Sequence, residues 1–264
     1  MSSPSSSQST SIPRVGTALV TGAARRLGAA ISLALARRGW DVAVHYATSA
    51  DDALQVVEKI RALGRKSVAL DCDLADEAST RRLVARTAEV LGSPTCLVNN
   101  ASRFTADDAA SFDYAALDAH VRVNLAAPVL LAHELHRQLP EDARGVVVNL
   151  LDQKLFNPNP DFLSYTLSKA GLQAATTLLA QALAPRLRVV GVAPGITLPA
   201  PGQGEASFSK AHTMTPLGHA SRVDDIANAV CFVVESPAIT GTTLLVDGGQ
   251  HLVPSERDIL FLAR

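Results

Sequence analysis

Two side chains past the middle of the chain have the types and spacing needed for acid–base chemistry. Tyr165 stands four residues before Lys169, so on a helix the two side chains share one face. A nearby ammonium stabilises a phenolate, which would lower the pKa of Tyr165 from about 10 toward working pH and make it a proton donor. Asp152, thirteen residues before the tyrosine, would complete a catalytic trio. The segment therefore predicts a site that moves protons.

The elements that position this trio follow from the hydrophobic pattern, in which short apolar runs alternate with longer helical patterns. The apolar runs predict strands over 15–22, 41–46, 66–74, 94–102, 145–151, 186–195 and 242–249. The helical patterns lie over 27–39, 49–64, 76–91, 113–137, 164–184 and 222–235. Strands that are apolar throughout and separated by helices indicate a parallel sheet covered on both faces. We expect one doubly wound α/β domain over 14–264 after a disordered Ser-rich tail over 1–13.

The composition argues against several classes of function. A net charge of −1, 4% aromatic residues and no basic stripe give no support for nucleic-acid binding. Cys72, Cys96 and Cys231 are far apart and form no CxxC pair, so we expect buried free thiols and no metal site. No apolar run is interpreted as long enough to span a bilayer, and the first residues carry no secretory signal. A cytoplasmic protein without a membrane partner is the default expectation.

A glycine-containing turn, TGAARRLG over 21–28, follows the first predicted strand. Glycines at a strand-to-helix turn let the backbone approach a pyrophosphate, and the helix N-terminus supplies N–H groups. The alternative is an ordinary tight turn. Arg25 and Arg26 stand where such loops often carry a small residue. Their guanidiniums would clamp phosphate oxygens, although a solvated basic face is the simpler alternative.

The end of the second predicted strand bears on the choice of cofactor. An acid at this point would bind the ribose hydroxyls of NAD, but the chain has no acid there until Asp51. His45, Thr48 and Ser49 occupy the region instead, and together with Arg25 they suit a 2′-phosphate. We therefore predict NADPH rather than NADH. Asp73, after the third strand, would accept from the adenine amino group or cap the next helix beside Asp76.

Over roughly residues 14–253 the chain resembles the short-chain dehydrogenase/reductase family. The matching segments are TG…G at 21–28, Asp73, NNA at 99–101, Asn124, Tyr165 with Lys169, and PG at 194–195 with Thr197 beyond it. The resemblance implies a seven-stranded parallel sheet, hydride transfer with NAD(P), Tyr165 as proton donor and Lys169 as ligand of the nicotinamide ribose. It also implies Asn124 as a link in a proton relay, and a homotetramer.

With this resemblance included, the residues predicted to contact the cofactor lie in the glycine turn and at the carboxyl ends of the strands. They are Gly22, Arg25, Arg26, Leu27, Gly28, His45, Thr48, Ser49, Asp73, Leu74, Asn100, Ala101, Ser102, Tyr165, Lys169, Pro194, Gly195 and Ile196.

The sequence departs from the family pattern at two positions. Arg26 replaces the middle glycine of the TGxxxGxG loop, and Asp152 replaces the usual catalytic serine. That serine hydrogen-bonds a substrate carbonyl oxygen as it gains negative charge, and a carboxylate in its place would repel the charge. A carboxylate is better suited to accept from N–H groups or to feed protons to a ring nitrogen. Asp152 therefore predicts a nitrogen heterocycle or an imine as substrate.

Both departures resemble the pteridine reductase branch of the family, which reduces biopterin- or folate-type pterins with NADPH. NNASRF at 99–104 is similar to the branch's NNAS-x-F, whose phenylalanine, here Phe104, stacks the pterin against the nicotinamide. The alternative for Phe104 is a core aromatic. The resemblance implies substrate contacts from Arg26, Ser102, Phe104, Asp152 and Tyr165. Members of the branch can carry an arginine after the second strand, where this chain has Thr48.

Two further segments bear on the substrate site. Residues 196–218, with three prolines and three glycines, predict a mobile loop that covers the substrate, and its His212 and Met214 would either line the pocket or pack elsewhere. The last residues, Ile259 to Leu262, are apolar and would pack either across a subunit interface or on their own chain.

Two other functions remain open from the sequence. One is a short-chain reductase of a carbonyl, such as a 3-oxoacyl thioester, in which Asp152 is an odd substitution. The other is a non-catalytic nucleotide-sensing relative, against which the intact Tyr165, Lys169 and Asn124 argue.

Overall fold

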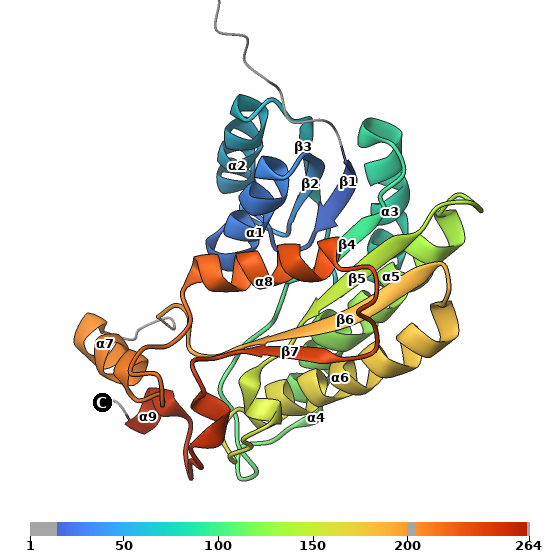
Figure 1. Cartoon of the computed structure of the whole chain (residues 1–264). Coiled ribbons are helices and arrows are strands. Elements are labelled where there is room, and N and C mark those ends of the chain that lie inside the picture. Colours follow the sequence, from blue (N-terminus) through green and yellow to red (C-terminus); the bar gives the residue numbers. More distant parts are fainter. Residues whose placement is uncertain (1–14, 200–203, 263–264) are drawn as a thin grey trace, which may run out of the picture.

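The computed structural model describes residues 15–199 and 204–262 and is built around one parallel sheet (Figure 1). Its seven strands run in the order β3-β2-β1-β4-β5-β6-β7. They are β1 (Gly16–Val20), β2 (Trp40–Tyr46), β3 (Ser67–Asp71), β4 (Cys96–Asn99), β5 (Gly145–Leu150), β6 (Leu187–Pro194) and β7 (Thr243–Val246). The predicted seven-stranded parallel sheet is confirmed, while the predicted tail over 1–13 lies outside the described residues. The order reverses between β1 and β4, the switch point where ligands bind in such sheets.

Helices cover both faces of the sheet. One layer consists of α1 (Arg26–Arg37), α2 (Ala50–Ala62) and α8 (Val223–Glu235), and the other of α3 (Glu77–Leu91), α5 (Ala127–Gln138) and α6 (Leu163–Leu183). Each layer presents its apolar stripe to the sheet, so a large core forms on each face, and a third, small cluster gathers Leu151, Leu172 and Ala193. Cys96 and Cys231 lie in the first core and Cys72 in the second, all as free buried thiols, as predicted.

The predicted helix over 113–137 is interrupted by a π-helical turn. The segment consists of α4 (Tyr114–Val121), the π turn Arg122–Ala126 and α5. Within the segment Tyr114–Gln138 an 18-residue window has a mean hydropathy of 1.2, enough by length and composition alone to cross a membrane, and the expectation that no apolar run is long enough did not anticipate this window. In this fold the segment packs against α3, α6 and β4, and a third of that window is buried.

Two further helices lie where the sequence predicted loop or left the structure open. The segment 196–218 contains α7 (Glu205–Thr213), so the prediction of a loop throughout is wrong there, and residues 200–203 lie outside the described part. Prolines and glycines flank α7 on both sides, which hid a helix of only nine residues. At the end of the chain α9 (Ile259–Leu262) packs against α7 on the same chain, the second of the two predicted alternatives.

Candidate active site

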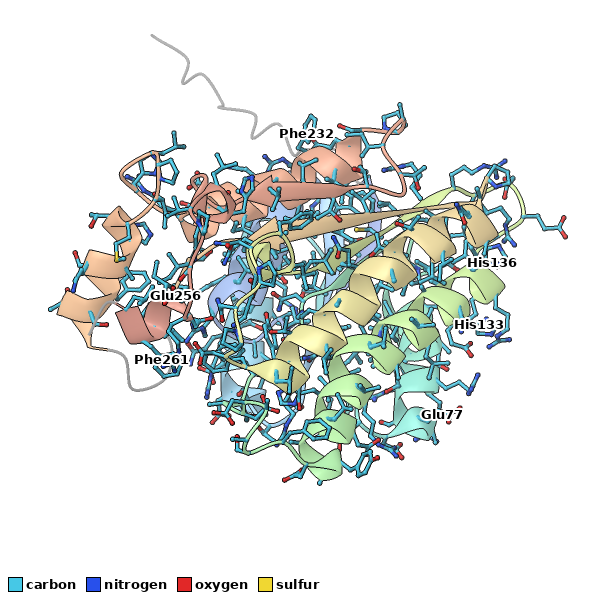
Figure 2. All side chains as sticks on the ribbon, turned by 90° about the horizontal axis from the view of Figure 1, so that it is seen from below. Glu77, His133, His136, Phe232, Glu256 and Phe261 are labelled. Carbon is cyan, nitrogen blue, oxygen red and sulfur yellow. The ribbon has the colours of Figure 1, made fainter. Side chains whose placement is uncertain are left out.

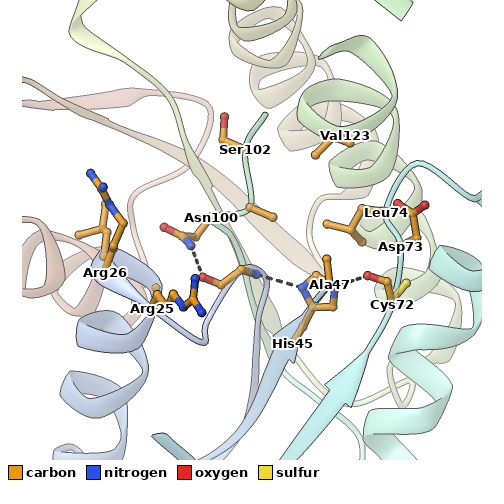
Figure 3. Close-up of a pocket in the computed structure, with 14 residues that line it drawn as sticks. Arg25, Arg26, His45, Ala47, Cys72, Asp73, Leu74, Asn100, Ser102 and Val123 are labelled. Atoms are coloured by element: carbon orange, nitrogen blue, oxygen red, sulfur yellow. Dashed lines mark hydrogen bonds between the residues drawn. The ribbon is translucent and has the colours of Figure 1, made fainter. Parts of the chain in front are cut away.

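A cleft of about 420 Å³ opens where β1, β2, β3 and β4 end (Figure 3). Most of the predicted cofactor residues line it: Gly22, Arg25, Arg26, Leu27, Gly28, His45, Asp73, Leu74, Asn100, Ala101 and Ser102. Three lining residues were missed, namely Ala47, Cys72 and Val123, and each lies within two positions of a residue that the sequence did single out. Seven predicted cofactor residues do not line this cleft: Thr48, Ser49, Tyr165, Lys169, Pro194, Gly195 and Ile196.

The glycine turn at the floor of the cleft is held by side chains from two other strands. Gly22 has a φ of +60°, and a Cβ at Gly28 would lie 2.2 Å from the Gly22 carbonyl oxygen, so neither position tolerates a side chain. The Asn100 Nδ2 donates to the carbonyl oxygens of Thr21 and Gly22 at 2.9 and 3.0 Å. The Thr21 hydroxyl accepts from the backbone N–H groups of Asn100 and Ala101. These hydrogen bonds hold the turn in place at the cleft, and its glycines allow the close backbone approach that a pyrophosphate needs.

His45 contributes to this turn from beneath it. Its Nδ1 accepts from the Gly22 N–H at 3.0 Å, so its Nε2 carries the proton and donates to the Cys72 carbonyl oxygen at 3.0 Å (Figure 3). The ring is buried, and burial lowers the pKa of His45 below its ordinary 6.5. The neutral imidazole thus joins the ends of three strands, β1, β2 and β3.

His45→Leu is expected to lower the free energy of unfolding by about 1–3 kcal/mol, because the Gly22 N–H and the Cys72 carbonyl lose their partner. The substitution should also make the free energy of unfolding less sensitive to low pH. Because the pKa of His45 is lowered in the folded state, the imidazole of the unfolded chain takes up a proton at a higher pH than that of the folded chain. The wild type therefore loses stability as pH falls below 6.5. Denaturant unfolding between neutral pH and about pH 5 measures both effects. His133→Leu, at an exposed histidine of α5, is the matched control (Figure 2), and equal losses in both variants would contradict the role of His45.

The two arginines of the turn have different partners. Arg25 forms an ion pair with Asp52 of α2 at 2.5 Å, and its side chain is 63% exposed at the rim of the cleft. Arg26 has a φ of +52° at the place where the family carries glycine, a conformation that costs about 1 kcal/mol for a residue with a side chain. Its Nη2 donates to the Pro199 carbonyl oxygen at 2.9 Å, which connects the turn to the segment after β6.

The end of β3 decides between the two predicted roles of Asp73, and the end of β2 shows where Ser49 and Thr48 lie. Asp76 caps α3 by accepting from the Ser79 N–H, so Asp73 is not the cap. The Asp73 carboxylate accepts from the Ala75 N–H and lies at the cleft. Ser49 is the N-cap residue of α2 without a side-chain cap bond, and Thr48 beside it is exposed.

Asp152 and Tyr165 meet at the end of β5. The Tyr165 hydroxyl donates to Asp152 Oδ2 at 2.7 Å, while Asp152 Oδ1 accepts from the Lys154 N–H at 2.8 Å. Burial raises the pKa of Asp152 above its ordinary 3.8. Burial and the facing Asp152 carboxylate also raise the pKa of Tyr165 well above 10, so the prediction of a lowered tyrosine pKa is wrong for this arrangement. Because both pKa values are raised, the Tyr165 hydroxyl and the Asp152 carboxyl both favour their protonated forms.

Lys169 does not hydrogen-bond the Tyr165 hydroxyl, which explains why the predicted lowering of the tyrosine pKa is wrong. Its Nζ donates to the Leu150 carbonyl oxygen at 2.7 Å and lies 5.9 Å from the centre of the Tyr165 ring. Burial lowers the pKa of Lys169 from 10.5 to about 8. The predicted common helix face is confirmed, since Tyr165 and Lys169 are both buried on α6 beside the end of β5.

Asn124, in the π turn, fixes the loop that follows β4. Its Nδ2 donates to the Arg103 carbonyl oxygen and to Ser168 Oγ, both at 3.0 Å, and its Oδ1 accepts from the Arg103 N–H at 2.7 Å. The Ser102 hydroxyl also donates to this Oδ1, at 3.3 Å. All the polar capacity of the amide is in use, so the structure shows Asn124 as a clamp on 102–103, and the predicted relay role stays a prediction.

The loop after β4 brings Phe104 to Tyr165. The Phe104 ring stacks on Phe162 with centroids 4.4 Å apart, and it meets the Tyr165 ring edge-on at 4.7 Å. With 40% of its surface exposed, Phe104 is not a core aromatic. Phe162 is a neighbour of Phe104 that the sequence did not indicate. It lies immediately before α6 with its backbone in the left-handed region, at a φ of +56°.

The remaining predicted residues lie on the β6 and β7 side of the site. The Ile196 N–H donates to Gln250 Oε1, and Thr197 Oγ1 lies 2.9 Å from Ser221 Oγ. His212 bonds the backbone of Ala220 and Ser221, and neither it nor the partly exposed Met214 lines the described cleft. Within 15–199 and 204–262 no group of three or more His, Cys, Asp or Glu side chains is arranged to hold a metal ion.

Known proteins with a similar sequence include several reductases. A family model described as enoyl-(acyl carrier protein) reductase matches residues 22–251. The 3-oxoacyl-(acyl-carrier-protein) reductase FabG of Staphylococcus aureus is 32% identical over 240 residues, which cover 89% of this chain and 98% of that protein. A ketoacyl reductase of the granaticin polyketide synthase of Streptomyces violaceoruber is 33% identical over 254 residues, covering 92% of this chain and 99% of the relative.

Among solved structures, the FolM alternative dihydrofolate reductase 1 of Brucella canis, in complex with NADP, matches with a TM-score of 0.89 and 41% identity. The match covers 94% of this chain and 98% of that one. A short-chain dehydrogenase of Burkholderia cenocepacia, also with NADP, matches with a TM-score of 0.83 and 36% identity over 90% of this chain and 99% of the other. On these matches the chain belongs to the short-chain dehydrogenase/reductase family, with the FolM structures supporting its place in the pteridine reductase-like branch.

Proposed function

We propose that the protein is an NADPH-dependent reductase that converts the C=N bond of a dihydropterin or dihydrofolate to the tetrahydro form. The observation that carries this proposal is the Asp152 carboxyl bonded to the Tyr165 hydroxyl at 2.7 Å, where related carbonyl reductases place a neutral serine. The FolM relatives at 41% identity, whose name describes a dihydrofolate reductase, support it. Oxidation of NADPH with dihydropterins and ketones in parallel tests it.

The cleft residues fit a dinucleotide phosphate. The turn of Gly22 and Gly28 would hold the pyrophosphate, Asp73 would accept from the adenine, and Arg25 would bind the 2′-phosphate with Thr48 and Ser49 beside it. Lys169 would hold the nicotinamide ribose and Pro194, Gly195 and Ile196 would border the ring, as the family implies. The bound cofactor supplies the hydride, and every proton comes from the protein or from water.

Arg25→Ala is expected to raise the Kd for NADPH by about tenfold and to leave the Kd for NADH nearly unchanged, because one charge-assisted contact to the 2′-phosphate is lost. Cofactor fluorescence titrations measure both constants. Asp52→Asn is the matched variant: it removes the partner of Arg25 but keeps the guanidinium, so NADPH affinity should hold or improve. Equal losses for NADPH and NADH in Arg25→Ala would contradict the assignment.

The proton chemistry follows from the count of protons on the Asp152–Tyr165 pair. A pair that carries two protons can give one to the substrate nitrogen and remain as a carboxylate hydrogen-bonded by a phenol, the arrangement present in the structure. A pair that starts with one proton would be left as two adjacent anions, which is costly in a buried site. The active form is therefore the doubly protonated pair, and the raised pKa of Asp152 extends this form to higher pH.

The substrate contacts follow from the side chains around this pair. Phe104 presents its partly exposed ring beside Tyr165 and would stack on the pterin, with Ser102 at the border between cofactor and substrate. Arg26 would reach the pyrophosphate and the pterin if it releases the Pro199 carbonyl. A homotetramer is the assembly that the family resemblance implies, and size-exclusion chromatography with light scattering would test it.

Reduction of a carbonyl, such as a 3-oxoacyl thioester, is the second candidate, favoured by the FabG and ketoacyl reductase relatives at 32% and 33% identity. In that reading Asp152 would have to be protonated to donate to the carbonyl oxygen, because its anion would repel the charge. Turnover of ketones but not of pterins would select it. A nucleotide-sensing protein without catalysis would bind NADPH and oxidise it with neither class of substrate.

A further inference from the structure

The end of the chain folds back over the active-site loop. We define the C-terminal segment as residues 253–262, and it contacts the loop 153–162 at several points. The Val253 carbonyl accepts from Asn157 Nδ2 at 2.7 Å, and Arg257 pairs with Asp161 at 2.8 Å. Phe261, which Figure 2 labels, stacks on Phe162 with ring centroids 5.9 Å apart. The C-terminal segment is thus the outer support of the aromatic stack that ends at Phe104.

Within these contacts one ion pair is buried. Lys154 Nζ lies 3.0 Å from Asp258 Oδ2, and the two side chains are only 4% and 16% exposed. The backbone around Asp258 is fixed as well, since the Asp258 N–H donates to Asp161 Oδ2 at 2.7 Å. Breaking such a pair leaves the remaining charge without water or partner, so its loss has consequences far larger than those of a surface ion pair.

Lys154 connects this ion pair directly to the catalytic pair. Its backbone N–H donates to Asp152 Oδ1, and its ammonium lies 5.2 Å from the centre of the Phe162 ring. The same short 3-10 turn, Gln153–Leu155, therefore carries both the backbone N–H that orients Asp152 and the ammonium that pairs with Asp258. The charged and titratable groups gathered here are Asp152, Lys154, Asp161, Tyr165, Lys169, Arg257 and Asp258.

We propose that Asp258 is a positioning residue for the reaction: it keeps the Lys154 ammonium paired away from Asp152, so that Asp152 can carry the proton that the substrate receives. The inference rests on the proposed proton chemistry, but on no particular substrate. Burial raises the pKa of Asp152, and the charge of Asp258 adds to that rise. Asp258 adds in the same direction at Tyr165, after burial and the Asp152 carboxylate.

The test is the pH dependence of kcat/KM in Asp258→Asn. The neutral amide removes the Asp258 anion and leaves the Lys154 cation unpaired in the turn that holds Asp152, and both changes favour the carboxylate. The pH at which kcat/KM falls from its acid plateau should therefore move down by roughly one unit, while the Kd for NADPH stays within about twofold. The infrared band of the protonated carboxyl, assigned with Asp152→Asn, should titrate with the same shift in the absence of any substrate.

Three further variants separate this role from mere packing. Arg257→Gln loosens the same segment but leaves Lys154 and Asp258 paired, so its pH profile should match the wild type. Lys154→Met leaves the Asp258 anion alone and should move the profile up, and it provides the test if Asp258→Asn does not fold. Asp258→Asn combined with Lys154→Met should return the profile toward the wild type.

Unchanged pH profiles in both Asp258→Asn and Lys154→Met would overturn the proposal. A shift in Arg257→Gln equal to that in Asp258→Asn would overturn it as well. The kinetic measurements can use any substrate that the protein reduces. The infrared titration needs no substrate. A protein that reduced only ketones would therefore overturn the proposed function without touching this inference.

Discussion

Asp152→Ser is expected to lower kcat/KM for a dihydropterin by about 10²–10³-fold, the size of effect that general acids typically contribute. The Kd for NADPH should change by less than about twofold, because Asp152 does not line the cofactor cleft. A serine cannot donate a proton at neutral pH as a carboxyl with a raised pKa can. It can hydrogen-bond a carbonyl oxygen, so any ketone activity should persist or rise. Steady-state NADPH oxidation with both substrate classes measures the change.

Two variants control this experiment. Asp142→Ser removes an exposed carboxylate of the same type near the start of β5 and should leave both activities unchanged. Asp152→Asn keeps the shape of the side chain but not its proton, and its loss should match that of Asp152→Ser. Pterin turnover that survives in both Asp152 variants would contradict a role of this carboxyl in protonation.

Tyr165→Phe is expected to lower kcat/KM by about 10³-fold for every substrate that the enzyme reduces. The phenylalanine keeps the ring that packs edge-on against Phe104, so the loss isolates the hydroxyl. The variant should also raise the apparent pKa of any residual activity, because the phenol hydrogen bond that lowers the pKa of Asp152 is lost, whereas Asp258→Asn should lower it. Initial rates across pH measure both quantities.

Tyr114→Phe is the matched control, because Tyr114 is 85% exposed on α4 and removing its hydroxyl should have no effect. Equal activity in Tyr165→Phe and the wild type would mean that the hydroxyl bonded to Asp152 is structural and that another group supplies the proton.

The fold was predictable because its signals are local and repeated. Each strand from β1 to β7 coincides with a predicted apolar run, and the glycine turn of Gly22 and Gly28 stands where the first strand meets the first helix. The same local reasoning placed Asp152, Tyr165 and Lys169 together at the end of β5, which the structure confirms.

What the sequence could not supply is the pairing of side chains across long separations. The tyrosine pKa was predicted in the wrong direction because spacing shows that Lys169 shares a helix face with Tyr165, but not that its ammonium bonds the Leu150 carbonyl. Lys154 and Asp258 are 104 residues apart, so no pattern joins them. The sequence predicts that Arg25 binds phosphate oxygens, but it does not show that the fold also gives this guanidinium Asp52 of the next helix as partner.

The measurement that tests the central claim most directly is the ratio of kcat/KM for dihydropterins to that for simple ketones. It uses the wild-type protein with NADPH, and 7,8-dihydrobiopterin, dihydromonapterin and dihydrofolate as the pterins. We predict turnover of at least one pterin and no detectable turnover of the ketones, because the carboxylate left on Asp152 after proton transfer accepts from the N–H of a reduced pterin and would repel an oxyanion. Efficient ketone turnover without pterin turnover would contradict it and would assign the protein to the carbonyl reductases of its family.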